Sequence, residues 1–136
     1  MPQGIIGPQG VTVITPPARE KLSKVAQVTA ADTNVGFAAF GLPQNAFIAG
    51  VYIISAGANA GGTQLIKVGF SNGGAELVND FAPNSTGFTT VGAQAGTAVG
   101  TQLTADKTVY VKASATLTNT VTVIVDYWMP PVGQGY

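Results

Sequence analysis

The fold of this chain is constrained most by an alternation of apolar and polar residues with a period of two. In residues 120–128, for example, the odd-numbered positions from Val121 to Tyr127 share one face of an extended strand, and a partly apolar set shares the other. Such alternation is typical of β-strands, whose successive side chains point to opposite faces. Because this stretch is apolar on both faces, we expect it in the centre of a sandwich or against another subunit.

Turn-forming residues cut the alternating stretches into short strands. We expect strands over residues 11–15, 25–29, 35–40, 47–55, 65–70, 88–91, 98–103, 109–115 and 120–128. Residues 18–24 are the one place where a helical turn or two fits. Residues 76–81 fit either a single helical turn or a loop that carries Leu77, Val78 and Phe81 inward. A hairpin through Thr118 and Asn119 is expected to join the last two strands.

This pattern predicts one all-β domain, a β-sandwich or jelly roll of about eight or nine strands, with a closed barrel as the alternative. Of the 136 residues 46% are hydrophobic, so the chain can build a core without disulfides, metals or cofactors. We expect an extended N-terminal arm over residues 1–17, the sandwich over residues 18–130 and a C-terminal tail over residues 131–136. The predicted core includes Phe37, Val51, Ile53, Val68, Phe70, Val111, Val123 and Val125.

The N-terminal arm combines residues that break regular structure with apolar residues that suit a binding surface. Its glycines and prolines, among them Pro16 and Pro17, disfavour both helix and central strand. Its apolar residues are Ile5, Ile6, Val11, Val13 and Ile14. We therefore expect the arm to be extended and to contact neighbouring subunits or the capsid surface, with strand addition to a partner's edge as the means. The chain shows no signal-peptide pattern, and no apolar run approaches the ~18 residues of a membrane helix.

The side chains on which most enzymes and metal sites depend are missing. The chain has no histidine and no cysteine, and only 9% of its residues are charged. Histidine is the usual general base near neutral pH, and both residues are leading metal ligands. Glu76 and Asp80 stand four apart, as paired carboxylates or weak calcium ligands on a helix would, but solvated loop acids are the favoured interpretation. We predict no enzyme, no cofactor and no metal site.

The charge pattern argues against nucleic acid as a partner. Six basic and six acidic residues give a formal net charge of zero. Nucleic-acid binders need clustered Lys and Arg, whereas the densest basic stretch here, Arg19, Lys21 and Lys24, is interrupted by Glu20. Weak self-repulsion instead permits close packing of many copies, which suits an assembly component.

Three aromatic residues, Tyr52, Tyr110 and Trp128, are candidates for exposed strand faces, where they could stack on sugars or bases. With no basic groove beside them, stacking on nucleic acid is disfavoured. Packing in the core or in an interface is the favoured interpretation, since aromatic residues dominate both settings. Carbohydrate binding stays open as the lesser alternative.

The segments LPQNAFIAGVYI at 42–53, GT at 62–63, KVGF at 67–70, KTVYV at 107–111 and VTVIVDY at 121–127 share strand and turn patterns with a known class of proteins. Over residues 35–127 the chain resembles small structural proteins of tailed-phage virions, and head decoration, or cement, proteins in particular. The resemblance implies a β-sandwich body, often trimeric, that sits on the outer capsid and clamps neighbouring subunits. It implies no catalytic residues.

Composition, arm and resemblance together predict a structural virion protein, a capsid decoration or cement protein that binds and stabilises the outer head surface. The alternative is a host- or carbohydrate-binding β module of a phage fibre or tail tip. The expected partners are the major capsid protein and further copies of the chain in a homotrimer, with no nucleic acid and no membrane. The expected location is the outer capsid surface, after synthesis in the host cytoplasm. The predicted interface residues are Ile5, Ile6, Val11, Val13, Ile14, Ile124, Trp128 and Met129.

Overall fold

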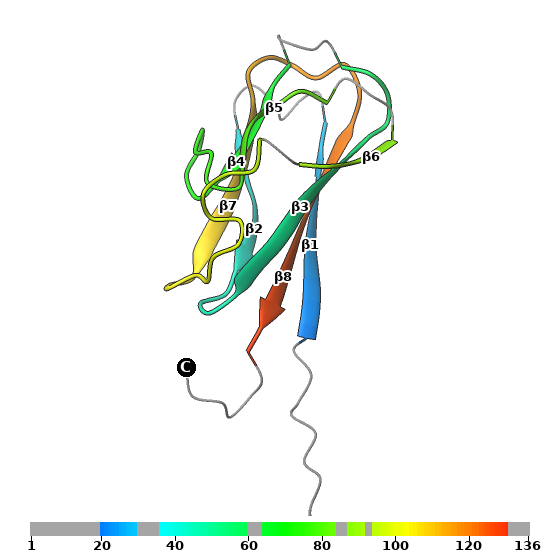
Figure 1. Cartoon of the computed structure of the whole chain (residues 1–136). Coiled ribbons are helices and arrows are strands. Elements are labelled where there is room, and N and C mark those ends of the chain that lie inside the picture. The colour runs from blue at the N-terminus through cyan, green and yellow to red at the C-terminus, as the bar shows by residue number, and fades with distance from the viewer. Residues whose placement is uncertain (1–19, 30–35, 60–63, 84–86, 92–93, 131–136) are drawn as a thin grey trace, which may run out of the picture.

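The computed structural model describes residues 20–29, 36–59, 64–83, 87–91 and 94–130, which form two β-sheets packed face to face (Figure 1). The eight strands are β1 (Glu20–Val28), β2 (Phe37–Leu42), β3 (Phe47–Ser55), β4 (Ile66–Gly69), β5 (Val78–Phe81), β6 (Gly87–Thr90), β7 (Lys107–Ala113) and β8 (Val121–Met129). All their pairings are antiparallel, and the described ranges contain no helix. The prediction of an all-β sandwich of about eight or nine strands is confirmed.

The two sheets have the strand orders β1-β8-β3-β6 and β2-β7-β4-β5. The pairing is nested, because β1 pairs with β8, β2 with β7, β3 with β6 and β4 with β5. This is the arrangement obtained when one long antiparallel hairpin, with its tip between β4 and β5, is rolled up into two layers. The hairpin predicted through Thr118 and Asn119 is therefore wrong. The strands on either side of it, β7 and β8, lie in different sheets, and an alternating pattern marks a strand without indicating its partner.

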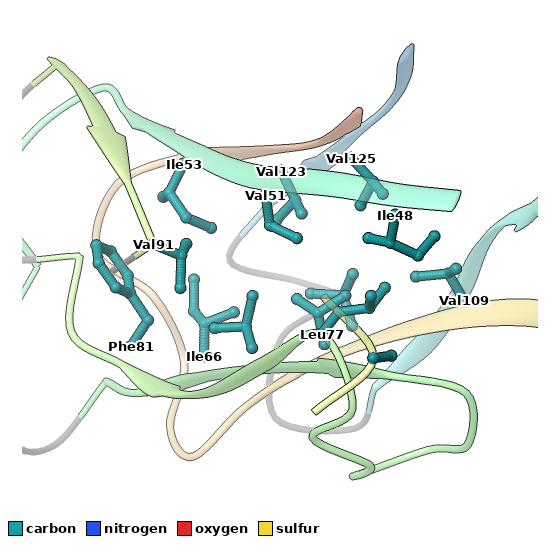
Figure 2. Packing of buried hydrophobic residues seen from close by; sticks show 14 of the residues in the cluster. Ile48, Val51, Ile53, Ile66, Leu77, Phe81, Val91, Val109, Val123 and Val125 are labelled. Atoms are coloured by element: carbon teal, nitrogen blue, oxygen red, sulfur yellow. The ribbon is translucent and has the colours of Figure 1, made fainter. Parts of the chain in front are cut away.

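The core lies between the sheets and is built from the inward-facing residues of both layers (Figure 2). One side of it consists of Ile48, Val51, Ile53, Val123 and Val125, and the other includes Ile66, Leu77, Phe81 and Val109. All the valines of the predicted core, and Ile53, are buried with at most 3% of their surface exposed. Phe37 and Phe70 are only partly buried and pack against the cluster from outside.

The described part of the predicted helical turn over residues 18–24, residues 20–24, is the first half of β1 instead. The strand pairs with β8 at every position, from Glu20 opposite Met129 to Val28 opposite Val121. The first residues of β1 are mostly polar, so they carry no clear period by which to recognise a strand. Pairing with β8 and contact with the sheet decide their conformation, since β-propensity depends strongly on context.

The segment 98–103 is a series of turns instead of the predicted strand. It runs beside the start of β3, where the Ile48 N–H donates to the Thr101 carbonyl (2.9 Å) and the Ile48 carbonyl accepts from the Gly100 N–H (2.8 Å). Gly100 has a φ of 86°, a left-handed conformation that turns the chain and that residues with a side chain rarely adopt. Leu103 is still buried, so the segment delivers its apolar residue to the core without a ladder of strand pairs.

The segment 76–81 follows the loop interpretation and forms no helical turn. A loop leads into the short strand β5, and Leu77, Val78 and Phe81 all point into the core, as that interpretation requires. The predicted arm over residues 1–17, with its strand at 11–15, and the tail over residues 131–136 lie outside the described residues, so the domain boundaries stay predictions.

Candidate functional site

One outer surface of the sandwich belongs to the sheet β1-β8-β3-β6, and its outward side chains form rows across the strands. In the central row, Val25 of β1 lies opposite Ile124 of β8, which in turn lies opposite Tyr52 of β3. On one side of the central row lies the row of Gln27, Thr122 and Ile54. On its other side lies first the row of Ser23, Asp126 and Gly50, and then the row of Lys21, Trp128 and Phe47. We call the surface made by these four rows the β8 face. Residues in a row are neighbours on this surface, because opposite residues of antiparallel strands have Cβ atoms only about 5 Å apart.

The β8 face is apolar over much of its extent. Within the described ranges, the exposed large hydrophobic residues are Val25, Phe47 and Ile54, with 58%, 37% and 37% of their surface in water, and all three lie on this face. Ile124 and Tyr52 lie between them and are half-buried. Single exposed apolar residues are ordinary, but a contiguous set marks an interaction surface.

The outer surface of the other sheet has a different character. The outward residues of β7 are Thr108, Tyr110 and Lys112, and Lys67 of β4 forms an ion pair with Asp80 of β5 at 3.8 Å between Nζ and Oδ1. Such a polar surface is typical of a sheet face in contact with water. The sandwich is therefore asymmetric, with one polar outer face and one outer face that is apolar over much of its extent.

A carboxylate is buried at one side of the β8 face. Asp126 is only 8% exposed although it points outward from β8. The Ser23 hydroxyl donates to its Oδ1 (2.5 Å), and the Lys21 ammonium lies 3.4 Å from its Oδ2. The same ammonium lies 6.0 Å from the centre of the Trp128 ring, at the limit of a cation–π contact. The positive charge of Lys21 is thereby balanced, and this end of the face presents no net charge.

Gly50 makes room for an aromatic side chain beside this carboxylate. It lies opposite Asp126 in the sheet, and a Cβ atom built on it would approach the Tyr52 hydroxyl to 3.1 Å and the ring carbon that bears it to 3.3 Å. The Tyr52 side chain therefore lies over the backbone of Gly50. A larger residue at position 50 would displace the ring, so the glycine keeps this part of the face flat.

The structure places the predicted interface residues in three different settings. Ile124 and Trp128 are half-buried on the β8 face, whereas Met129 points to the other side of β8 and packs against the core. The predicted arm residues lie outside the described residues: Ile5, Ile6, Val11, Val13 and Ile14. The exposed large hydrophobic residues of the face, Val25, Phe47 and Ile54, are not among the predicted residues. Their common face follows only from the pairing of β1 and β3 with β8.

The two carboxylates singled out in the sequence do not form a pair. Glu76 precedes β5, and its Oε1 accepts a hydrogen bond from the Phe70 N–H (2.8 Å). Asp80 lies within β5 and faces Lys67 instead. Each is thus engaged in its own structural contact, which differs from the predicted solvated loop acids. The described residues contain no group of three or more His, Cys, Asp or Glu that could hold a metal ion.

The aromatic candidates divide between the two outer surfaces. Tyr52 and Trp128 belong to the β8 face, where Phe47 joins them opposite Trp128, and Tyr110 lies on the polar face of the other sheet. Membrane insertion by a helix has no basis in the described residues, which include no helix of sufficient length and apolar character.

Comparison with solved structures finds the same fold in phage capsids. A chain of the capsid asymmetric unit of cyanophage Pam1 matches with a TM-score of 0.59 and 15% identity, over 96% of this chain and 100% of that chain. A chain of the acidic stable capsid of Helicobacter pylori bacteriophage KHP30 matches with a TM-score of 0.56 and 19% identity, over 84% of this chain and 95% of that chain. A chain of the capsid of Ralstonia phage GP4 matches with a TM-score of 0.57 and 17% identity, over 89% and 92% respectively.

No protein-family model and no curated protein matches the sequence. The similarity to the three phage capsid chains is therefore one of fold, at identities of 15 to 19%, and it extends over nearly the whole length of each of them.

Proposed function

We propose that the chain is a structural protein of a phage virion that decorates the outer surface of the head, and that its sandwich is a jelly roll. The nested pairing of eight strands in two sheets supports the jelly roll, an architecture found in viral capsid domains. The matches to chains of three phage capsids support a place in the virion, because they cover 92% or more of each of those chains.

The observation that carries this proposal is the apolar β8 face. Val25, Phe47 and Ile54 are exposed together on it, and apolar surface in water is unfavourable by about 25 cal/mol per Å². A partner that covers the face recovers this free energy. Since the other outer surface is polar, the molecule has one side suited to attachment and one suited to water, as a protein bound to the outside of a larger shell requires.

Charge and side-chain chemistry support a structural, non-enzymatic role. A net charge of zero allows copies to lie close together on a capsid. Histidine and cysteine are absent from the sequence, and Glu76 and Asp80 are each held by structural contacts. The proposed partners are the major capsid protein and further copies of the chain in a homotrimer, which would clamp neighbouring capsid subunits as a cement protein does.

Sedimentation with particles that lack the protein tests the attachment. Ile54→Asp places a charge on the β8 face, and Thr108→Asp places the same charge on the polar face, where Thr108 is exposed. Both variants should stay folded, because both positions are accessible to water. The wild type and Thr108→Asp should pellet with particles. Ile54→Asp should bind at least tenfold more weakly, since an unpaired charge buried in an interface costs more than about 1.4 kcal/mol.

Equal binding of all three proteins would contradict attachment through the β8 face, and a wild type that stays in the supernatant would contradict the decoration role. Thermal denaturation of each protein shows whether a loss of binding reflects a loss of fold.

One observation favours the second candidate, a host- or carbohydrate-binding module of a fibre or tail tip. Phe47, Tyr52 and Trp128 lie together on the β8 face, and aromatic side chains are the usual platforms for sugar rings. A glycan array separates the two candidates: binding of a defined glycan that Trp128→Ala abolishes, without attachment to particles, would favour the module.

A further inference from the structure

The β8 face ends at an unusually long and regular edge, the strand β1 (Figure 1). β1 has nine residues and pairs with β8 at every one of them without a bulge. The other edge strands are less suited to accept a partner. β5 and β6 have four residues each, and the six-residue β2 has an irregularity between Ala38 and Phe40. Among the described strands, β1 is therefore the best template for an added strand.

The outer edge of β1 has no backbone partner within the described residues. β8 is the one strand that pairs with it there, and no main-chain hydrogen bond from a described turn or loop reaches residues 21–28. Every second N–H and C=O of β1 therefore points away from β8. Beside this edge lies Val25, the most exposed of the large hydrophobic residues, so an added strand would also lengthen the apolar central row of the β8 face.

Lysines often protect open edges, but the two lysines of β1 do not lie across this one. Lys21 reaches over β8 to Asp126 and the Trp128 ring. Lys24 points to the inner side of the sheet, where it lines an open groove between the two layers together with Asp106. Neither lysine covers the row of backbone groups between them.

We propose that residues 11–15 of a second copy of the chain add to β1 as a further strand. This segment, Val-Thr-Val-Ile-Thr, consists wholly of β-branched residues, which have the highest strand propensity. Both faces of the segment are partly apolar, so either face can pack beside the exposed Val25. No residue before Arg19 has a charged side chain, so the added strand brings no like charge against Lys21 or Lys24.

Two prolines indicate that the added segment comes from a second copy and not from the chain that contains β1. Residues 16–19 alone connect the segment to β1, and a hairpin back onto the chain's own β1 would have to turn through Pro16 and Pro17. A proline is disfavoured at the second central position of a type I turn, and consecutive prolines favour an extended conformation. Residues 16–19 span up to about 14 Å when extended, which is enough to reach the β1 edge of a copy that lies alongside.

This inference goes beyond the proposed function, because copies can exchange the segment without a particle. The test therefore uses the purified full chain alone, and its result does not depend on whether the protein attaches to capsids. Val13→Pro removes the amide hydrogen from the middle of the segment, and Gln3→Pro makes the same change outside it. We expect light scattering to give an oligomer for the wild type and Gln3→Pro, and a smaller species for Val13→Pro.

Hydrogen exchange resolved to single amides gives the sharper measurement. In the assembled wild type, all amides should be protected in the part of β1 that the five-residue segment covers. In Val13→Pro, every second amide of that part should lose its protection, while the alternate amides that bond to β8 stay protected and show that the fold is intact. A monomeric wild type would overturn the proposal, and so would an assembled wild type in which every second β1 amide exchanges freely. Equal effects of Val13→Pro and Gln3→Pro would overturn it as well.

A crosslink identifies the copy that donates the segment. The chain has no cysteine, so Val13→Cys combined with Val25→Cys creates the two sole thiols, and Val25 is exposed enough to tolerate the change. A short bismaleimide should join different chains and produce dimers and larger species on a denaturing gel. Crosslinking within single chains would overturn the assignment to a second copy.

Discussion

Replacing Leu77 by alanine tests whether the loop before β5 is an integral part of the core. Leu77 is fully buried between the layers (Figure 2). Its N–H donates to the Val68 carbonyl (2.9 Å) and its carbonyl accepts from the Gly96 N–H (3.0 Å), and both main-chain bonds survive the substitution. Loss of three buried carbons costs about 2.4 kcal/mol at about 0.8 kcal/mol each, and the cavity left behind raises the total to about 3–4 kcal/mol. For a chain of this size the melting temperature should fall by about 10 °C.

Leu65→Ala is the matched control, because it removes the same atoms from a half-exposed position just before β4. The Leu65 N–H donates to the Ser114 hydroxyl (2.9 Å), and this bond also survives. The control should cost about 1 kcal/mol. Urea denaturation followed by the fluorescence of Trp128, the single tryptophan, gives both free energies of unfolding. Equal costs for the two variants would refute the reasoning, and so would a cost for Leu77→Ala below about 1 kcal/mol.

Three further changes test other parts of the structure. Val123→Asp buries a charge at a position with no exposure, which costs several kcal/mol against a total stability of about 5–15 kcal/mol, so circular dichroism should show an unfolded chain. Ser23→Ala should lower the free energy of unfolding by about 1 kcal/mol, because it removes a hydrogen bond to a charged carboxylate. In a chain that already carries Asp126→Asn the loss should be clearly smaller, and equal losses in both backgrounds would contradict this. Gly96→Ala should destabilise the fold by several kcal/mol, because the new Cβ would collide with main-chain carbonyls just before β5. Gly41→Ala is the control and should leave the melting temperature nearly unchanged, because the nearest atom to its new Cβ lies 3.8 Å away.

The strands with a large aliphatic inner face were the most predictable ones. The predicted range 47–55 coincides with β3, and the predicted range 120–128 differs from β8 by one residue at each end. Both strands have an inner face of large aliphatic residues, so the sheet and the core impose the same alternation that the sequence shows. β1 lacks this signal over its first half. Among the described strands it is an edge strand, so it pairs with a single one of them, β8, and fewer of its residues are constrained to be apolar.

The residues of the β8 face were predictable only within β8. Ile124 and Trp128 share a face because they are an even number of positions apart on one strand. Phe47 and Ile54 are an odd number of positions apart, and they reach the same face because β3 has an irregularity between Ile48 and Gly50 that shifts its phase. Val25 joins them through the register of β1 against β8. The irregularity in β3 and the register of β1 are properties of the tertiary structure, so the pattern within a single strand does not indicate these exposed apolar residues.

The central place of β8 also determines when the sheet can form. β8 follows the other strands along the chain, yet in its sheet it lies between β1 and β3. Ser23 of β1 and Asp126 of β8, which are joined by a hydrogen bond, are 103 positions apart. Contacts that close such long loops are slow to form, because the entropy of the loop is lost before the contact stabilises anything. During synthesis on the ribosome, β1 lacks its pairing strand until β8 has emerged. Until then the central row of the β8 face, from Val25 to Tyr52, is also incomplete. The order of synthesis therefore delays the apolar surface until β8 can complete both the sheet and the core. An incompletely synthesised chain does not present the complete β8 face.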